Sequence, residues 1–314
     1  MVDILPEHLI HKILWYLNFD EEAAKTRFLS KTWLQAWFTC PNLKFEIGYG
    51  EDNNYGKIDK IMERYRERKI PIEKFALSVF AYYYHSLDFQ LIDKWLGIAL
   101  QNGVKVLVDF FYVLSYPLPI STFLTSKSLR ELVVTGCDLM DLSLSTSQVD
   151  NCHSLRKLSL TNVRLDDNLL QSLLACCPLI IDFIIVNCHL LRNIELRNLQ
   201  SIKSVSISIN VHLIQSVKIQ APTLEHFSYT GCLRGESHVL DIIECQNLKS
   251  LKLSHMKISE GFLRHLISTF QFLESLILYN VCGELENFNI CGSESLKVLG
   301  IQSCKGICFK FVIT

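Results

Sequence analysis

The amino-acid sequence predicts an α/β solenoid in which short strands form one parallel sheet, preceded by a small helical segment. A four-position apolar pattern recurs along most of the chain, and one strand per repeat would explain it. The first 45 residues instead carry apolar side chains at helical spacing. The chain of 314 residues is 49% hydrophobic and 20% charged, which is typical of a packed core rather than a disordered chain.

The repeat is clearest at Leu155–Val163, where apolar residues stand at offsets 0, 3, 5 and 8. Leu158 and Leu160 are two apart, which predicts a strand with one buried face, and Val163 returns to the core after a turn. The first three offsets recur eight times at spacings of 22 to 26 residues, and the fourth is apolar in every copy except the one at Ile202, where it is Asn210. The copies start at Leu129, Leu155, Ile180, Ile202, Leu224, Leu248, Leu273 and Leu296. This period is typical of leucine-rich repeats, whose strands line a horseshoe.

The repeats predict eight parallel strands and two kinds of connection between them. The strands are expected at 132–134, 158–160, 183–185, 205–207, 227–229, 251–253, 276–278 and 299–301. Asp166–Cys177 has the apolar stripe of a helix, and Ser259 is typical of the residue that caps another. The repeats that start at Ile202 and Leu224, which are 22 and 24 residues long, leave little room for a helix.

Residues 72–112 hold two degenerate repeats. Ile72, Phe75 and Leu77 fit the strand offsets, and a helix that follows is expected to end at Gly103. A strand is expected over Val104–Tyr112, but its register is ambiguous because Asp109 stands where an apolar residue is expected.

The chain divides into three parts: helices in 1–45, a linker and connecting helix in 46–70, and repeats in 71–314. Three helices are expected in the first part, the second over Glu21–Phe28 and the third over Lys31–Phe38. The connecting helix, Lys57–Lys69, has a basic face that could bind an anion or nucleic acid. Acidic neighbours and a formal net charge of −1 favour an ordinary solvated face.

Three short motifs in the helical part resemble the F-box: Leu5-Pro6-Glu7, Ile13-Leu14-x-x-Leu17 and Leu29-Ser30-Lys31-x-Trp33. Together with Trp95-x-x-x-Ala99 and Leu118-Pro119, they make nearly the whole chain resemble plant F-box/LRR proteins. The resemblance implies that residues 1–45 form an F-box that docks on a Skp-type adaptor, and through it on a cullin-RING ubiquitin ligase.

The resemblance also implies which residues contact the adaptor. They are Leu5, Pro6, Ile10, Ile13, Leu14, Leu17, Leu29, Ser30 and Trp33. Among them Leu5, Pro6, Ile10, Ile13, Leu14 and Trp33 are expected to be partly exposed in the isolated chain.

The strand face that points away from the core is the expected binding surface for a target protein. Its centre is hydroxyl-rich, and exposed apolar islands on such a face are candidate anchors unless loops of the same chain cover them. One apolar island is Ile184 with Val186, and the other is Ile277 with Tyr279 and Val298. Lys252 and Gln302 form a polar rim, and these seven residues are the predicted substrate-binding residues.

Other kinds of function find little support in the sequence. It contains no phosphate-binding loop and no hydrolase motif, so no catalytic residue and no cofactor are predicted. The cysteines lack the ligand spacing of structural zinc, and no metal is predicted. The near-zero net charge does not favour nucleic acid, and no apolar run reaches the roughly 18 residues of a membrane span. The N-terminus lacks a secretion signal, so the cysteines are expected to be reduced and the protein cytoplasmic or nuclear.

We therefore expect a non-catalytic substrate-recognition subunit of an SCF-type ubiquitin ligase, with the adaptor on the F-box and the target on the concave face of the repeats. Two alternatives remain open. One is a leucine-rich-repeat interaction scaffold without a ligase link. The other is a small-molecule sensor of the kind found among hormone receptors that resemble F-box/LRR proteins.

Overall fold

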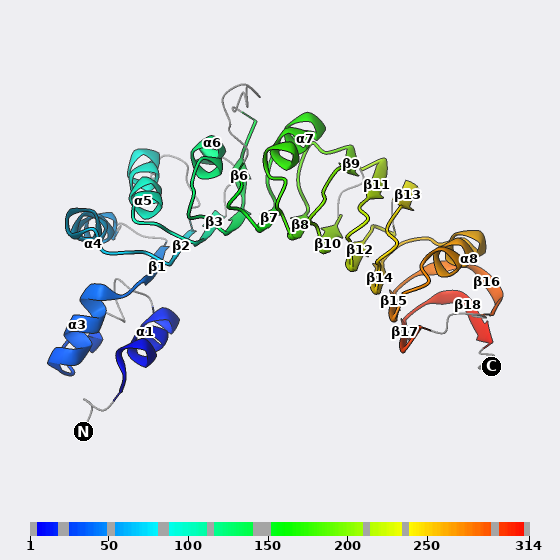
Figure 1. Cartoon of the computed structure of the whole chain (residues 1–314), viewed down its shortest axis with the longest axis horizontal. Helices are drawn as coiled ribbons and strands as arrows, with labels where there is room; N and C mark the ends of the chain where they lie inside the picture. The colour runs from blue at the N-terminus through cyan, green and yellow to red at the C-terminus, as the bar shows by residue number, and fades with distance from the viewer. Residues whose placement is uncertain are drawn as a thin grey trace. The chain divides into compact units, whose positions relative to one another are not determined.

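The computed structural model describes residues 5–17, 25–48, 54–80, 88–111, 116–140, 152–209, 214–233, 239–289 and 295–310. The chain forms two compact units, Met1–Leu155 and Arg156–Thr314 (Figure 1). Each unit contains a parallel sheet with one strand per repeat, which confirms the leucine-rich-repeat solenoid.

The first unit begins with two helices, α1 (Glu7–Tyr16) and α3 (Lys31–Thr39). Pro6 precedes α1, and its carbonyl accepts the amide N–H groups of Leu9 and Ile10. Ser30 caps α3, because its hydroxyl accepts the amide N–H of Trp33 at 3.3 Å. Most of the predicted second helix, Glu21–Phe28, lies outside the described residues.

The sheet of the first unit contains β1 (Asn42–Ile47), β2 (Lys74–Val79), β3 (Val106–Phe111) and β5 (Glu131–Thr135), paired in this order and all parallel. Helices α4 (Tyr55–Arg68), α5 (Phe89–Gln101) and α6 (Ile120–Leu124) connect them, and β4 (Tyr116–Pro117) pairs with β6 (Cys137–Asp138). The sheet thus begins at residue 42, inside the segment predicted as purely helical and before the predicted repeat boundary at 71. Helix α5 ends where Gly103 takes a φ of 82°.

The second unit continues the repeat with seven parallel strands. They are β7 (Lys157–Thr161), β8 (Asp182–Val186), β10 (Ser204–Ser208), β12 (His226–Thr230), β14 (Ser250–Ser254), β15 (Ser275–Tyr279) and β17 (Val298–Gln302). Every predicted three-residue strand lies inside one of these or inside β5, and every pair within the unit is parallel.

The opposite side of the second unit varies with repeat length (Figure 1). Long spacers form the predicted helices α7 (Asp167–Cys176) and α8 (Glu260–Thr269), which Asp166 and Ser259 cap. The repeats that start at Ile180, Ile202 and Leu224, of 22 to 24 residues, form short strands instead: β9 (Asn193–Leu196), β11 (Ser216–Gln220) and β13 (Val239–Ile243). These pair as a second parallel sheet, and β16 (Cys282–Asn289) and β18 (Lys305–Lys310) form a further pair.

A backbone turn after the strand joins neighbouring repeats. Asn162, Asn187, His255 and Asn280 each take a φ of about 50° one residue beyond a strand, and their amides donate to the carbonyl at the end of the next strand. Asparagine is more tolerant than most residues of this left-handed conformation, which explains its recurrence. Below the turn, the Cys188 thiol donates to the carbonyl of the preceding strand, and Cys304 does the same.

Asp109 resolves the ambiguous register of β3, because its side chain points into the core. Leu107, Asp109 and Phe111 are the buried positions of this strand. The neighbours of Asp109 in register are Leu77 and Val134, and neither of its carboxylate oxygens has a hydrogen-bond partner. Burial raises the pKa of this carboxyl well above its usual value.

An ion ladder crosses the start of five neighbouring strands in the second unit, β10, β12, β14, β15 and β17. Lys203 and Lys249 lie 3.2 and 2.8 Å from the carboxylate of Glu225, and Lys297 lies 3.1 Å from that of Glu274. Lys249 also interacts with Glu274. Hydrogen bonds from Lys249 and Lys203 lower the pKa of Glu225 to about 2. We call these five residues the lysine–glutamate ladder.

Candidate protein-interaction surfaces

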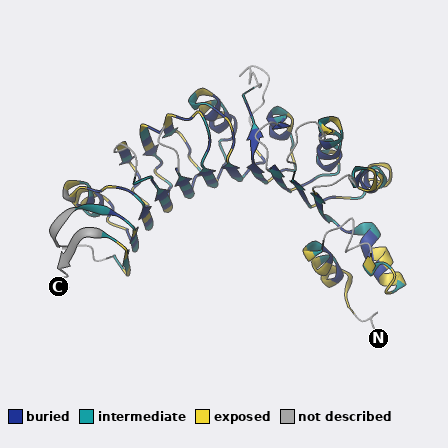
Figure 2. Cartoon of the chain, turned by 180° about the vertical axis from the view of Figure 1, so that it is seen from behind, coloured by how far each residue is buried: buried dark blue, intermediate teal, exposed yellow. Residues whose placement is uncertain are grey.

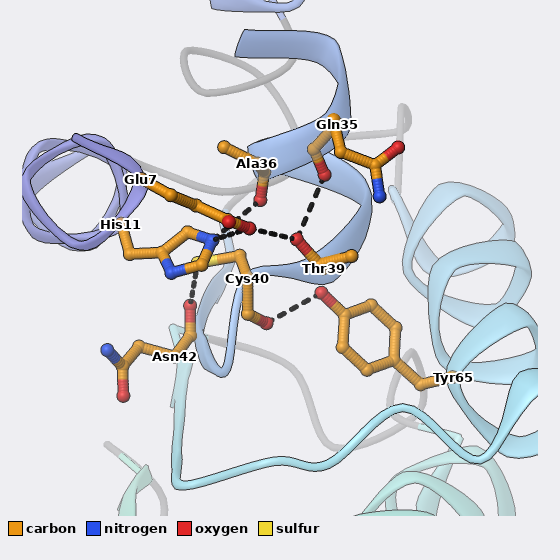
Figure 3. Close-up of polar contacts among 8 residues, drawn as sticks. All are labelled: Glu7, His11, Gln35, Ala36, Thr39, Cys40, Asn42 and Tyr65. Atoms are coloured by element: carbon orange, nitrogen blue, oxygen red, sulfur yellow. Dashed lines mark hydrogen bonds and ion pairs between the residues drawn. The ribbon is translucent and has the colours of Figure 1, made fainter. Parts of the chain in front are cut away.

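Polar contacts join the two N-terminal helices (Figure 3). The Thr39 hydroxyl donates to the Glu7 carboxylate at 3.0 Å, and His11 Nε2 lies 3.6 Å from the same group. His11 Nε2 also donates to the Ala36 carbonyl at 3.2 Å, since a carbonyl oxygen can only accept. The helices are therefore held in one arrangement by packing and by hydrogen bonds.

Three residues predicted to be partly exposed are buried. Helix α1 packs on α3 and β1, which buries Ile10 and Leu14 completely, and Trp33 is only 5% exposed. These side chains form the small core of the helical segment, so the prediction of their exposure is wrong. Helical spacing marks an apolar face but does not say whether that face packs inside the chain or against a partner.

The exposed apolar residues of the helical segment lie on other faces, and Figure 2 shows exposed positions on both helices. Leu5 and Pro6 are exposed, and Ile13 and Leu29 are 40% and 54% exposed. Leu17 and Ser30 are half-buried. Leu5, Pro6, Ile13 and Leu29 therefore remain available to a partner.

Sequence reasoning missed the two most exposed aromatic residues in the described part of this segment. Tyr16 is 82% exposed and Phe28 is 78% exposed. Leu9, Ile13 and Tyr16 follow one another at intervals of four and three residues, which places them on one face of α1. That spacing could have identified the face from the sequence. We call Leu5, Leu9, Ile13, Tyr16, Phe28 and Leu29 the exposed apolar set.

An arginine attaches the helical segment to the first repeat helix. The Arg64 guanidinium on α4 lies 4.4 Å from the centre of the Trp37 ring and 4.8 Å from that of Phe38. The Tyr65 hydroxyl donates to the Cys40 carbonyl at 2.7 Å (Figure 3). Arg64 thus stacks on aromatic rings. The basic face of α4 is predicted to be solvated, and only part of it is free of packing.

The second candidate surface is the outward sheet face of the second unit, made of the first, third and fifth residues of each strand from β7 to β17. Tyr279 and Val298 are 38% and 51% exposed. Ile277 lies between Lys252 and Gly300 in register, and Tyr279 lies beside Gln302. Five of the predicted substrate-binding residues are therefore gathered on β14, β15 and β17.

Glycine at position 300 shapes this cluster. A Cβ at Gly300 would lie 3.5 Å from the Ile277 side chain, so glycine leaves one flank of Ile277 uncovered. The Tyr279 ring packs against His255 with centroids 5.3 Å apart. Aromatic and aliphatic side chains held in this way are typical anchors of protein interfaces.

The other predicted island, Ile184 and Val186, lies on β8, away from this cluster. Ser206 and Ser208 of β10 are its neighbours in register, and both island residues are half-buried. The strands between the islands carry mostly hydroxyl side chains, with His226 and Lys252 exposed among them. On the outward sheet face, a polar centre thus lies between the two apolar islands.

The fold and these surfaces define the class of the chain, a leucine-rich-repeat protein with an N-terminal helical segment. A model of the leucine-rich-repeat domain of the At1g61320/AtMIF1 family matches residues 61–245. The chain therefore belongs to this leucine-rich-repeat family, within the plant F-box/LRR proteins.

Several proteins of Arabidopsis thaliana are similar to this chain. F-box/LRR-repeat protein At3g03360 is 22% identical over 98% of the chain and 62% of its own length. F-box/LRR-repeat protein 25 is 26% identical over 74% of the chain and 86% of its length. F-box protein At5g03100 is 23% identical over 90% of the chain and 92% of its length. The chain spans only 36%, 62% and 63% of three longer relatives.

The described ranges contain neither a metal-binding cluster nor a membrane-spanning helix. No group of three or more histidine, cysteine, aspartate or glutamate residues there is arranged to hold a metal ion. Likewise, none of the helices in the described part of the chain has the length and apolar character needed to cross a membrane.

Proposed function

We propose that this chain is the substrate-recognition subunit of an SCF-type ubiquitin ligase. Residues 1–45 act as the F-box and bind a Skp-type adaptor, and the outward sheet face binds the protein to be ubiquitinated. The chain itself performs no catalysis, because the adaptor links it to the cullin and the RING subunit. This division of labour follows the F-box motifs and the names of the Arabidopsis relatives.

The exposed apolar set carries the adaptor assignment. Its six large apolar side chains lie at the surface between residues 5 and 29, and the core residues Ile10, Leu14 and Trp33 hold the helices that present them. Exposed apolar patches of this kind mark protein-interaction surfaces. Leu5, Pro6, Leu17 and Ser30 would then contribute at the edge of the adaptor interface.

The adaptor assignment is tested with the variant Ile13→Ser with Leu29→Ser, measured against a purified Skp-type adaptor bound to a cullin fragment. Both side chains are about half exposed, so their replacement removes adaptor contacts and little of the core. Each should contribute about 1 kcal/mol or more, and the pair should weaken binding by at least about tenfold.

Val298→Ser is the matched control, because it removes an exposed apolar side chain from the second unit. Circular dichroism checks that all variants are folded. Undiminished adaptor affinity in the double variant would refute the assignment of these residues to the adaptor interface. Failure of the wild-type chain to bind the adaptor would leave an interaction scaffold without a ligase link.

For the target, we propose that Ile277 and Tyr279 act as anchors and that Lys252, Val298 and Gln302 surround them. The second island, Ile184 and Val186, provides a further contact for a long partner. Tyr279 offers a large ring with a polar end, a residue type enriched at binding hot spots.

The variant Ile277→Ser with Tyr279→Ser is tested in cells with the proteasome blocked, by comparing the ubiquitinated proteins that co-purify with it and with the wild type. The double variant should lose them, while Phe272→Ser, which removes a 60% exposed ring outside the strands, should keep them. Retention by the double variant would place the target elsewhere on the chain.

A further inference from the structure

The three-stranded sheet formed by β9, β11 and β13 has two edges, and only one of them is capped by a helix. At β9, the residues facing away from β11 are Asn193 and Glu195. Gln171 of α7 donates to the Glu195 carbonyl at 2.6 Å, and the Asp167 carboxylate accepts the Asn193 amide at 3.1 Å. Helix α7 therefore satisfies the backbone of this edge, as folded proteins commonly do for exposed strands.

At the β13 edge, no side chain of the described residues forms such a cap. The Val239 amide donates to the Gln215 carbonyl of β11. Along a strand, successive residues direct their backbone N–H and C=O groups alternately to one side and to the other. Leu240 and Ile242 therefore direct their N–H and C=O groups away from β11. Among the described residues, β13 has no strand neighbour except β11.

The outer face of β13 is apolar at both ends and acidic in the middle. Val239 and Ile243 are 58% and 44% exposed, and Asp241 stands between them. Asp241 forms no ion pair with any residue in the described ranges. An uncapped strand with two exposed β-branched side chains is the surface that strand addition by a partner requires.

The register of the sheet indicates what that partner carries. Glu195, Lys218 and Asp241 are neighbours across the three strands, so charges alternate and the row ends on an acidic residue. A fourth strand would continue the alternation with a lysine or arginine opposite Asp241. The residues two positions before and after it would meet Val239 and Ile243, which favour β-branched apolar partners.

We propose that the β13 edge binds an extended segment of a partner protein, in which a basic residue is flanked at alternate positions by β-branched apolar residues. The segment adds as a fourth strand, so backbone hydrogen bonds from Leu240 and Ile242 give affinity and the Asp241 row gives specificity. This surface lies across the second unit from the outward sheet face, and it does not depend on the ligase assignment.

The proposal is tested with the full-length chain and a fluorescent peptide in which valine, lysine and isoleucine alternate with threonine. Anisotropy titration should show saturable binding. Asp241→Lys replaces an attractive cross-strand pair by a repulsive one and should weaken binding about tenfold. A second peptide with glutamate in place of lysine should restore the affinity of this variant.

Two controls separate strand addition from general adhesion. A peptide methylated on the backbone nitrogens of its pairing edge should not bind, because its side chains are kept but its donors are lost. Val298→Ser removes an exposed apolar residue from the outward sheet face and should leave binding unchanged.

Any of four results would overturn the proposal. They are no saturable binding up to about 1 mM, equal binding of the methylated peptide, unchanged binding by Asp241→Lys, or a loss that the glutamate peptide does not restore. Asp241 lies on the outer face of its strand, so Asp241→Lys should fold, and circular dichroism verifies that it does.

Discussion

Replacing Asp109 by valine should stabilise the first unit, and the gain should increase with pH. The carboxyl is fully buried, lies between apolar neighbours in register and has no hydrogen-bond partner. Valine fills much of the same space, suits a strand and brings no polar group into the core.

The magnitude has two parts. A buried polar group without a partner costs about 1–3 kcal/mol. The second part is protonation: because the folded pKa is raised, the folded chain keeps a proton that the unfolded chain releases above pH ~4. Each further pH unit therefore lowers stability by about 1.4 kcal/mol until the folded pKa is reached. The gain from Asp109→Val should be about 1–3 kcal/mol near pH 4 and should grow as the pH rises above that value.

Urea unfolding followed by circular dichroism, repeated between pH 5 and 8, measures this gain. Asp241→Asn is the control, since it removes an acidic group from an outward strand position and should change stability by no more than about 0.5 kcal/mol. If Asp109→Val were less stable than the wild type, or if both had the same pH dependence, the assignment of Asp109 as an unsatisfied core carboxyl would be refuted.

Three further substitutions test the packing. Gly136→Ala should cost about 3 kcal/mol or more in urea unfolding, because φ is 73° and a Cβ would lie 1.8 Å from the Phe111 carbonyl oxygen. Gly97→Ala lies in helix α5, where a Cβ would meet no other atom, and it should instead stabilise the fold by about 0.5–1 kcal/mol. Equal effects of the two glycine substitutions on stability would contradict both predictions. Arg64→Ala should remove about 2 kcal/mol of stacking and speed amide exchange in α3, and unchanged exchange would argue against that attachment. Leu160→Ala, at a fully buried strand position, should cost about 2–5 kcal/mol, and a loss under 1 kcal/mol would mean that the site collapses around the cavity.

The strands of the repeats could be predicted from the sequence because strand alternation and the turn are local features. Leu158 and Leu160 are two residues apart, and only a strand places both in one core. The same is true of the caps at Ser30, Asp166 and Ser259, whose side chains bond to amides three residues later.

What could not be predicted depends on contacts between distant segments. The spacing of Ile10, Leu14 and Ile13 marks apolar positions on α1, but only the packing of α3 and β1 decides which of them are buried. The short repeats that start at Ile202 and Leu224 left little room for a helix but did not indicate that β13 would end a second sheet. Asp109 carried too weak a local signal, because a charged residue in a strand normally points to solvent.

The lysine–glutamate ladder limits how this protein can gain or lose repeats. Lysine and glutamate alternate from one repeat to the next, so each carboxylate lies between two ammonium groups. Deleting the single repeat that contains Glu225 would place Lys203 beside Lys249, whereas deleting two consecutive repeats would keep the alternation. The repeats in this region are therefore not interchangeable units, and changes in their number by recombination should be tolerated better in pairs than singly.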